Sequence, residues 1–147
     1  MAAWGGPYSP EQGAEELRHY LDHYERYGFG PYAVFDDDVF VGDLGLQRLE
    51  GGPHVELLYR LSSLVWGHGL ATEACDAVLN YGFINLMLPE VVAVIAEDNL
   101  ASQRLAAKLG FIAGDLGTYY GHRLVRHHIT ADLHARSLAV REPSVRN

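Results

Sequence analysis

The chain has little cysteine and no long apolar run. Its single cysteine, Cys75, cannot form an intramolecular disulfide, and the sequence shows neither a secretory signal nor a stretch hydrophobic enough to cross a bilayer. We therefore expect a cytoplasmic protein without membrane association. Cys75 falls inside a predicted helix, where a small buried residue is a simpler interpretation than a reactive thiol.

Basic residues are also scarce. Eleven lysines and arginines stand against 19 acidic residues, so the net charge is −8. This balance argues against nucleic acid as a partner, because binding a phosphate backbone needs a basic face. An acidic surface would attract a cationic amine, although solubility alone explains the charge equally well.

Metal-binding patterns are missing as well. The sequence has no cysteine pair and no His-Glu-x-x-His motif. His19 and His23 are four residues apart on a predicted helix, but such an exposed pair is commonly just solvated. His127 and His128 are adjacent on a predicted strand, so their side chains point to opposite faces. We predict no functional metal.

The 147 residues, 48% hydrophobic, are enough for one globular domain. We place it at residues 1–133 and expect residues 134–147 to form a loose tail. The patterns predict helices starting at Ser9, Leu70 and Asn99, and strands at residues 32–35, 39–49, 54–61, 91–96, 111–116 and 122–133. Antiparallel strands, two strand–helix units and a closing hairpin indicate an α+β sheet whose central strands diverge.

Local signals support several of these elements. Ser9 is a predicted N-cap, with Pro10 at the first helical position and Gln12 closing a capping box. In the second strand, Gly42 and Gly45 suggest bulges. An apolar stripe on the first helix is expected to face the core or the wall of a substrate cleft. It consists of Leu17, Tyr20, Leu21 and Tyr24.

The most informative segment is a glycine turn that runs straight into a helix, Trp-Gly-His-Gly-Leu-Ala-Thr-Glu at residues 66–73. The first N–H groups of a helix have no intrahelical partner and, with the helix dipole, favour an anion such as a pyrophosphate. Gly67 and Gly69 supply the backbone freedom for a close approach. Alone, the motif also fits a glycine turn that merely caps a helix.

Two other glycine-loop families fit less well. A P-loop ends in Gly-Lys-Ser/Thr, which is absent here. A Rossmann loop needs a third glycine where Thr72 stands and follows its strand directly, whereas residues 62–66 intervene. Glu97 imitates the ribose-binding acid of that family. A dinucleotide oxidoreductase would bind NAD(P) and have no affinity for acetyl-CoA.

A second segment favours an acyl-CoA site. Asn99-x-x-Ser102 opens a predicted helix that ends in Lys-Leu-Gly-Phe at residues 108–111. Together with the glycine turn, it resembles the GNAT superfamily of N-acetyltransferases, and in particular the ribosomal-protein (RimJ/RimL-type) branch. Trp66 replaces the Gln/Arg of the usual GNAT loop, and Leu70 replaces an aromatic residue of the branch motif. The resemblance covers about residues 4–133.

The resemblance implies a GNAT-like fold, a mixed and mostly antiparallel sheet flanked by helices. It also implies direct transfer of an acetyl group from acetyl-CoA, as co-substrate, to a primary amine on a protein N-terminus or a small molecule. Carried over residue by residue, the acetyl-CoA site comprises Leu61, Trp66, Gly67, His68, Gly69, Leu70, Ala71, Thr72, Asn99 and Ser102.

The resemblance further implies catalytic roles. Glu56 is the candidate base for the amine, although an ordinary strand-surface glutamate fits the strand pattern equally well. The backbone N–H near Leu61 would face the thioester carbonyl. Ser102 would lie near the sulfur and Asn99 would bind the pantetheine arm. Without the resemblance, Asn99 reads as a helix cap with Ser102 in the first turn.

Tyr119 and Tyr120, between the last two strands, are reserve candidates for the acid or for the wall of the acceptor cleft.

One expected part is missing. GNAT chains normally open with a strand and a helix ahead of the segment that resembles residues 4–7 here, so the chain reads as N-terminally truncated. The strand at residues 32–35 would then lie bare at the sheet edge, and we expect a homodimer. The alternative to an enzyme is a non-catalytic GNAT-like module that binds an acyl-CoA or a protein partner.

Overall fold

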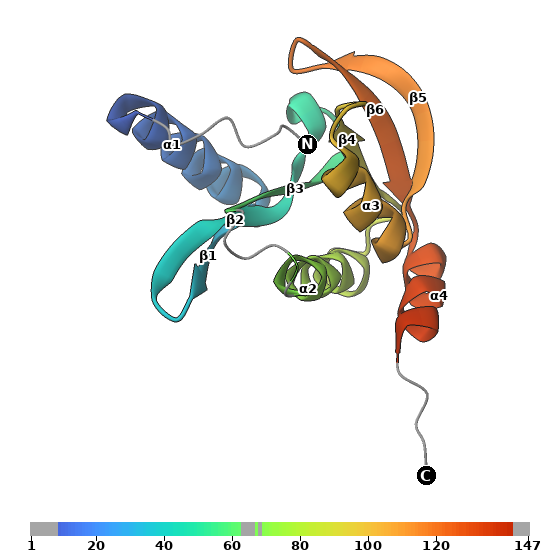
Figure 1. The fold of residues 1–147 in the computed structure, drawn as a ribbon. Helices are drawn as coiled ribbons and strands as arrows, with labels where there is room; N and C mark the ends of the chain where they lie inside the picture. The colour runs from blue at the N-terminus through green and yellow to red at the C-terminus, as the bar shows by residue number, and fades with distance from the viewer. Residues whose placement is uncertain (1–8, 63–66, 68, 143–147) are drawn as a thin grey trace.

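A computed structural model describes residues 9–62, 67 and 69–142 (Figure 1). The helices are α1 (Pro10–Tyr27), α2 (Leu70–Ile84), α3 (Leu100–Leu109) and α4 (Ala131–Arg141), with a 3-10 turn, η1 (Leu49–Gly51). The strands are β1 (Pro31–Asp36), β2 (Val39–Arg48), β3 (Val55–Leu61), β4 (Val91–Ile95), β5 (Ile112–Tyr119) and β6 (His122–Ile129). Within the described ranges, no helix is both long and apolar enough to span a membrane.

The strands form one six-stranded sheet in the order β1-β2-β3-β4-β6-β5. Every neighbouring pair is antiparallel except β3 and β4, which run parallel. The predicted mixed, mostly antiparallel α+β sheet is therefore confirmed. The two halves of the sheet meet at its parallel pair.

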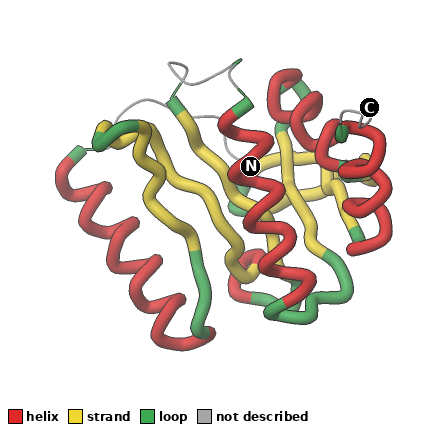
Figure 2. The backbone as a smooth tube through the Cα atoms, turned by 90° about the horizontal axis from the view of Figure 1, so that it is seen from below, coloured by secondary structure: helices red, strands yellow, loops and turns green. Residues whose placement is uncertain are grey.

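The helices lie on both faces of the sheet (Figure 2). Alternate residues of β3 point to opposite faces, so Leu57 joins the core beneath α2 while Arg60 reaches the other face. There Arg60 contacts Glu16 and Tyr20 of α1. Thus α1 covers the face opposite to α2, beside the strands that precede the glycine turn.

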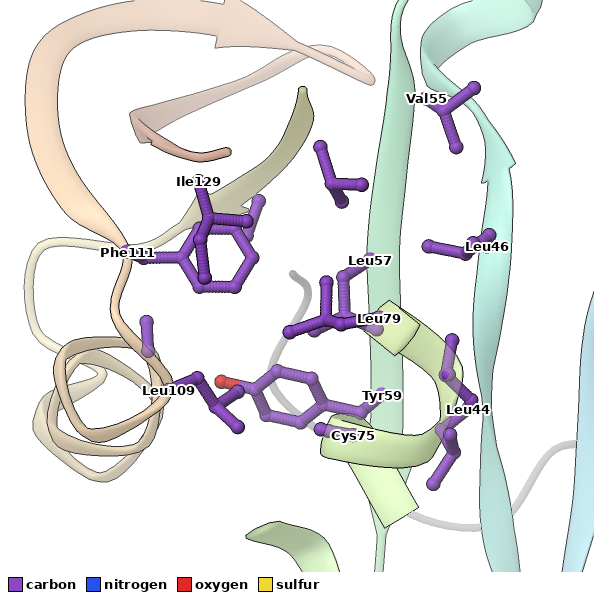
Figure 3. Close-up of a cluster of buried hydrophobic side chains, with 14 of the residues drawn as sticks. Leu44, Leu46, Val55, Leu57, Tyr59, Cys75, Leu79, Leu109, Phe111 and Ile129 are labelled. Atoms are coloured by element: carbon purple, nitrogen blue, oxygen red, sulfur yellow. The ribbon is translucent and has the colours of Figure 1, made fainter. Parts of the chain in front are cut away.

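The main hydrophobic core lies between the sheet and α2 and α3 (Figure 3). Leu57 and Leu79 are fully buried at its centre, and Ile129 of β6 closes the far side. Cys75 is also fully buried, as predicted, and burial raises its pKa to about 12. The thiol is therefore protonated at neutral pH and serves as packing.

The two parallel strands pair at one position and then separate. Only Glu56 and Val92 are partners between β3 and β4, whereas β2 and β3 stay paired from Arg48–Val55 to Gly42–Leu61. Helices α2 and α3 both begin beyond the carboxyl ends of these parting strands. The predicted divergence of the central strands is therefore present, and it directs two helix N-termini toward the same gap.

The carboxyl end of the chain differs from the prediction. A loose tail from residue 134 is wrong for residues 134–141, and the strand predicted to continue to residue 133 ends at Ile129. Instead, Thr130 caps α4. Asp76 of α2 then holds α4 by accepting hydrogen bonds from both terminal nitrogens of Arg141 and contacting His134. These partners are 58 and 65 residues apart in sequence, so local patterns could not reveal them.

The predicted capping box of Ser9 and Gln12 is present. Two other predictions are corrected in part, the apolar stripe of α1 and the bulges of β2. On α1, however, Leu17 and Leu21 are more than half exposed, because the helix packs through its tyrosines and not its leucines. The only shift in the β1–β2 register lies beside Gly42, while the pairing continues regularly through Gly45.

Candidate active site

A buried carboxylate lies where the central strands part. The Glu56 side chain is 1% exposed and faces away from the main core. Its Oε2 atom accepts a hydrogen bond from Gln47 Nε2 at 3.1 Å and another from the Tyr120 hydroxyl. Burial raises the pKa of Glu56, and the two hydrogen bonds oppose this rise. Glu56 is therefore a buried, hydrogen-bonded carboxylate, and its interpretation as an ordinary strand-surface glutamate is wrong.

Tyr120 reaches Glu56 from the β5–β6 hairpin, which lies beyond β4 in the sheet. It sits in the two-residue turn between β5 and β6, and both turn residues, Tyr120 and Gly121, have positive φ angles of 53° and 76°. The Tyr120 oxygen also accepts the backbone N–H of Glu50 at 3.1 Å. Burial and the adjacent carboxylate raise the pKa of Tyr120, so the hydroxyl remains a donor to Glu56.

The two reserve tyrosines therefore have different surroundings. Tyr119 packs against a small apolar cluster that includes Leu49, Val92 and Leu124. Tyr120 contacts polar groups of the site instead. The structure thus connects only Tyr120 to Glu56.

Gln47 completes this group and was not predicted as a site residue from the sequence. It stands directly opposite Glu56 in the β2–β3 pairing, and its Nε2 atom is also 3.5 Å from the Tyr120 oxygen. Its Oε1 atom is buried with no hydrogen-bond partner. The strand register could have indicated a neighbour of Glu56, but not which residue, because register depends on the whole hairpin.

On the other side of β3, a tyrosine connects the strand to α3. Asn99 caps α3 by accepting the Ser102 N–H at 3.2 Å, and Ser102 is buried. The Ser102 carbonyl accepts a hydrogen bond from Tyr59 of β3 at 3.0 Å. Because Tyr59 and Glu56 point to opposite faces of β3, Glu56 and Ser102 approach the parting strands from different sides. Tyr59 was not predicted as a site residue.

The predicted glycine turn has the expected backbone. Gly67 and Gly69 have φ angles of 82° and 75°, in the left-handed region that favours glycine. Gly69 is the N-cap of α2 and offers no side chain to the amides of the first turn, which begins at Leu70, Ala71 and Thr72. An anion is one group that would satisfy these amides.

Two of the predicted site residues, Trp66 and His68, lie outside the described residues. Leu61 ends β3 as a buried residue opposite Gly42. Across the described ranges, no group of three or more His, Cys, Asp or Glu side chains could hold a metal ion.

A family model described as an acetyltransferase (GNAT) domain matches residues 1–112. The uncharacterised N-acetyltransferase YoaA of Bacillus subtilis is 35% identical over 77 residues, which are 52% of this chain and 44% of that protein. The chain spans about half the length of the curated relatives it matches.

Solved structures share the fold. A putative GNAT-family acetyltransferase from Bordetella pertussis is 29% identical with a TM-score of 0.73, covering 82% of this chain and 77% of that one. RimJ of Mycobacterium smegmatis, solved in complex with CoA-disulfide, is 23% identical with a TM-score of 0.70, covering 88% and 68%. The second likeness shows the fold alone.

Proposed function

Because this chain belongs to the GNAT acetyltransferase family, we propose that it transfers the acetyl group of acetyl-CoA to a primary amine. The observation that carries this proposal is the buried Glu56 carboxylate at the point where β3 and β4 part. A carboxylate whose pKa is raised by burial is a stronger base than one in water. It is held in one orientation by Gln47 and Tyr120.

The proposed reaction is a direct transfer. The amine nitrogen forms a bond to the acetyl carbon, the carbon–sulfur bond breaks, and its electron pair leaves with the sulfur. The amine proton goes to Glu56. The thiolate of CoA, stabilised by a hydrogen bond from the hydroxyl of Ser102, takes a proton from water. The proton on Glu56 later neutralises the hydroxide that this leaves. The backbone N–H at Leu61 faces the developing negative charge on the carbonyl oxygen.

Acetyl-CoA would bind at the two helix N-termini beside the gap. The amides that follow Gly69 suit its pyrophosphate, and Gly67 and Gly69 leave room, since a Cβ atom at either position would meet nothing within 4 Å. Asn99 and Ser102 would line the pantetheine arm at the start of α3. Among the proteins with this fold, RimJ has been solved with CoA-disulfide and RimL with coenzyme A.

For the acceptor we propose a protein N-terminus or a small-molecule amine. A free α-amino group has a pKa near 8, against about 10.4 for lysine, so it needs less help to lose its proton. One structure with this fold is named a ribosomal L7/L12 alpha-N-protein acetyltransferase. The net charge of −8 would favour a cationic acceptor at long range.

Turnover tests the catalytic roles. An amine screen that detects free CoA should find turnover by the wild type, and Glu56→Gln should lower kcat by about 10²–10⁴-fold because the base is lost. Ser102→Ala should slow the release of free CoA by a smaller factor than Glu56→Gln does. The wild-type rate should fall as pH drops through the Glu56 pKa, which lies above 4.5, because only the carboxylate accepts a proton. Glu25→Gln, an exposed change of equal charge on α1, is the control.

Calorimetry separates catalysis from binding. Acetyl-CoA should bind the wild type and Glu56→Gln alike, and replacement of Gly69 by tryptophan should abolish binding. NAD, the control ligand, should not bind. Wild-type rates in both catalytic variants at saturating substrate would refute the assignments, and folded wild type that binds acetyl-CoA without turnover of any amine would favour a non-catalytic module.

We also propose that the protein forms a homodimer through β1. This strand lies at the edge of the sheet, and its hairpin with β2 exposes large apolar side chains. They are Tyr32, Phe35, Val39 and Phe40. An exposed apolar edge strand tends to pair with another chain.

A further inference from the structure

The buried Glu56 carboxylate is hydrogen-bonded to a solvent-exposed tyrosine. Glu56 is 1% exposed, whereas Tyr120 is 46% exposed. An amine in solution can therefore contact Tyr120, whereas Glu56 offers it almost no accessible surface. A base that no substrate atom can contact can act only through a proton relay or after the site has opened.

The tyrosine is held in an unusual backbone conformation. Tyr120 and Gly121 form a turn in which both central residues have positive φ, the type favoured between antiparallel strands. Asparagine or aspartate usually takes the first of these positions, because a large side chain there costs about 1–2 kcal/mol. A strained residue at a site is a reason to look for a function. Here the strain directs the hydroxyl inward to Glu56.

The hydrogen bonds of the hydroxyl suit a proton relay. The hydroxyl has one proton and two lone pairs. Its proton is donated to Glu56, and one lone pair accepts the Glu50 N–H at 3.1 Å. Among the described residues, the second lone pair has only Gln47 Nε2 at 3.5 Å, the limit of a hydrogen bond. That lone pair can therefore accept a better donor, such as an amine N–H.

We propose that Tyr120 is a catalytic residue that relays the acceptor proton to Glu56, an inference that rests on the proposed acetyl transfer. As the amine nitrogen bonds to the acetyl carbon, its proton passes to the Tyr120 oxygen while the Tyr120 proton passes to Glu56 Oε2. Tyr120 ends neutral, and Glu56 ends as a carboxylic acid. After the product leaves, the reverse path returns the proton to water.

The test compares Tyr120→Phe with Tyr119→Phe on the full chain. Both remove one hydroxyl from adjacent residues, but Tyr119, the other reserve candidate from the sequence, packs in an apolar cluster and is not connected to Glu56. With an amine that the wild type acetylates, Tyr120→Phe should lower the kcat plateau by about 10²-fold or more and leave KM for acetyl-CoA nearly unchanged. Tyr119→Phe should keep the wild-type kcat.

The pH profile distinguishes a relay from a structural bond. If Tyr120 only stabilises the Glu56 carboxylate, its removal shifts the acid limb to higher pH and leaves the plateau, and the proposal fails. A faster Tyr120→Phe enzyme would show that Tyr120 blocks Glu56 and would also overturn it. An inactive wild type refutes the acetyl transfer itself, and the relay with it.

A second variant covers the case in which Tyr120→Phe does not fold. Fluorotyrosine at position 120 keeps the hydroxyl and lowers its pKa. Since a relay moves the Tyr120 proton in the transition state, the kcat plateau should change as fluorine atoms make the hydroxyl more acidic. A plateau equal to that of the wild type with every fluorotyrosine would overturn the relay.

Discussion

At the residue scale, close contacts determine which side chains a position can hold. Gly42 is the clearest case, because a Cβ atom there would lie 2.0 Å from the carbonyl oxygen of Arg60 on the neighbouring strand. The sequence predicted a bulge here, and the register shift beside Gly42 agrees with it, but the close contact with Arg60 was not predicted. Its close approach to β3 depends on the pairing of Gly42 with Leu61, which no local pattern contains.

Gly42→Ala should therefore lower the free energy of unfolding by at least about 2 kcal/mol, because the strands must move apart next to the site. Gly51→Ala is the matched control. It also has positive φ, but its Cβ would meet nothing within 4 Å, so only the backbone conformation costs about 1–2 kcal/mol. Urea unfolding measures both. Equal losses would show that the contact with Arg60 adds nothing.

At the element scale, α1 is attached by polar groups more than by apolar ones. Arg60 of β3 forms ion pairs with Glu16 of α1 and Asp43 of β2. His23 lies buried near the end of α1, with Nδ1 2.6 Å from the Phe29 carbonyl and Nε2 2.9 Å from the Arg48 N–H. These partners require Nδ1 to donate and Nε2 to accept, so the ring is neutral.

The docking of α1 should therefore depend on pH. Burial lowers the pKa of His23 below 6.5, so the folded state binds fewer protons than the unfolded state as pH falls below that value. The contribution of His23 to the free energy of unfolding should therefore decrease as pH falls below 6.5, because the folded ring can take up a proton only by losing the bond from the Arg48 N–H. Burial lowers the pKa of His127 as well, which adds to the same trend.

Urea unfolding at pH 7 and pH 5 measures this loss. His23→Gln should be less stable at pH 7 and should lose less stability between pH 7 and pH 5 than the wild type. Its remaining pH dependence combines His127, which acts in the same direction, with Asp43, whose pKa of about 6 acts in the opposite direction. His19→Gln, on the exposed side of the same helix, should keep the wild-type slope. An unchanged slope in His23→Gln would contradict the assignment.

At the scale of the whole molecule, the sheet brings together groups that are far apart in sequence. Glu56 on β3 and Tyr120 in the β5–β6 turn are 64 residues apart, yet the two side chains are hydrogen-bonded because the β5–β6 hairpin curves back over the sheet (Figure 1). The same sheet leaves β1 at its edge, so the surface proposed for the dimer is separate from the site.

The dimer predicts a simple result. The wild type should sediment as a dimer at micromolar concentration, and Phe35→Lys should make it monomeric, because a charge on an edge strand opposes pairing. Phe35 is 59% exposed in the single chain, so this change should not unfold it. Ala14→Lys, an exposed change of equal charge on α1, should remain dimeric. A monomeric wild type would refute the proposal.

The sequence by itself determined the elements and the family. Capping residues, glycines at helix ends and apolar periodicity are local signals, so α1, α2 and α3 and most strand positions followed from them. The glycine turn and the Asn99-x-x-Ser102 segment identified the family for the same reason. Glu56 was selected through that resemblance, since strand patterning left it indistinguishable from a surface residue.

Only the tertiary structure decided the surroundings of Glu56. Its burial, its bonds to Gln47 and Tyr120, and the pairing of Asp76 with α4 all join segments distant in sequence. Such contacts depend on strand order and register, which emerge when the whole sheet assembles and leave no periodic trace in the chain. The chemistry of the site therefore comes from local residue types, and its geometry from long-range packing.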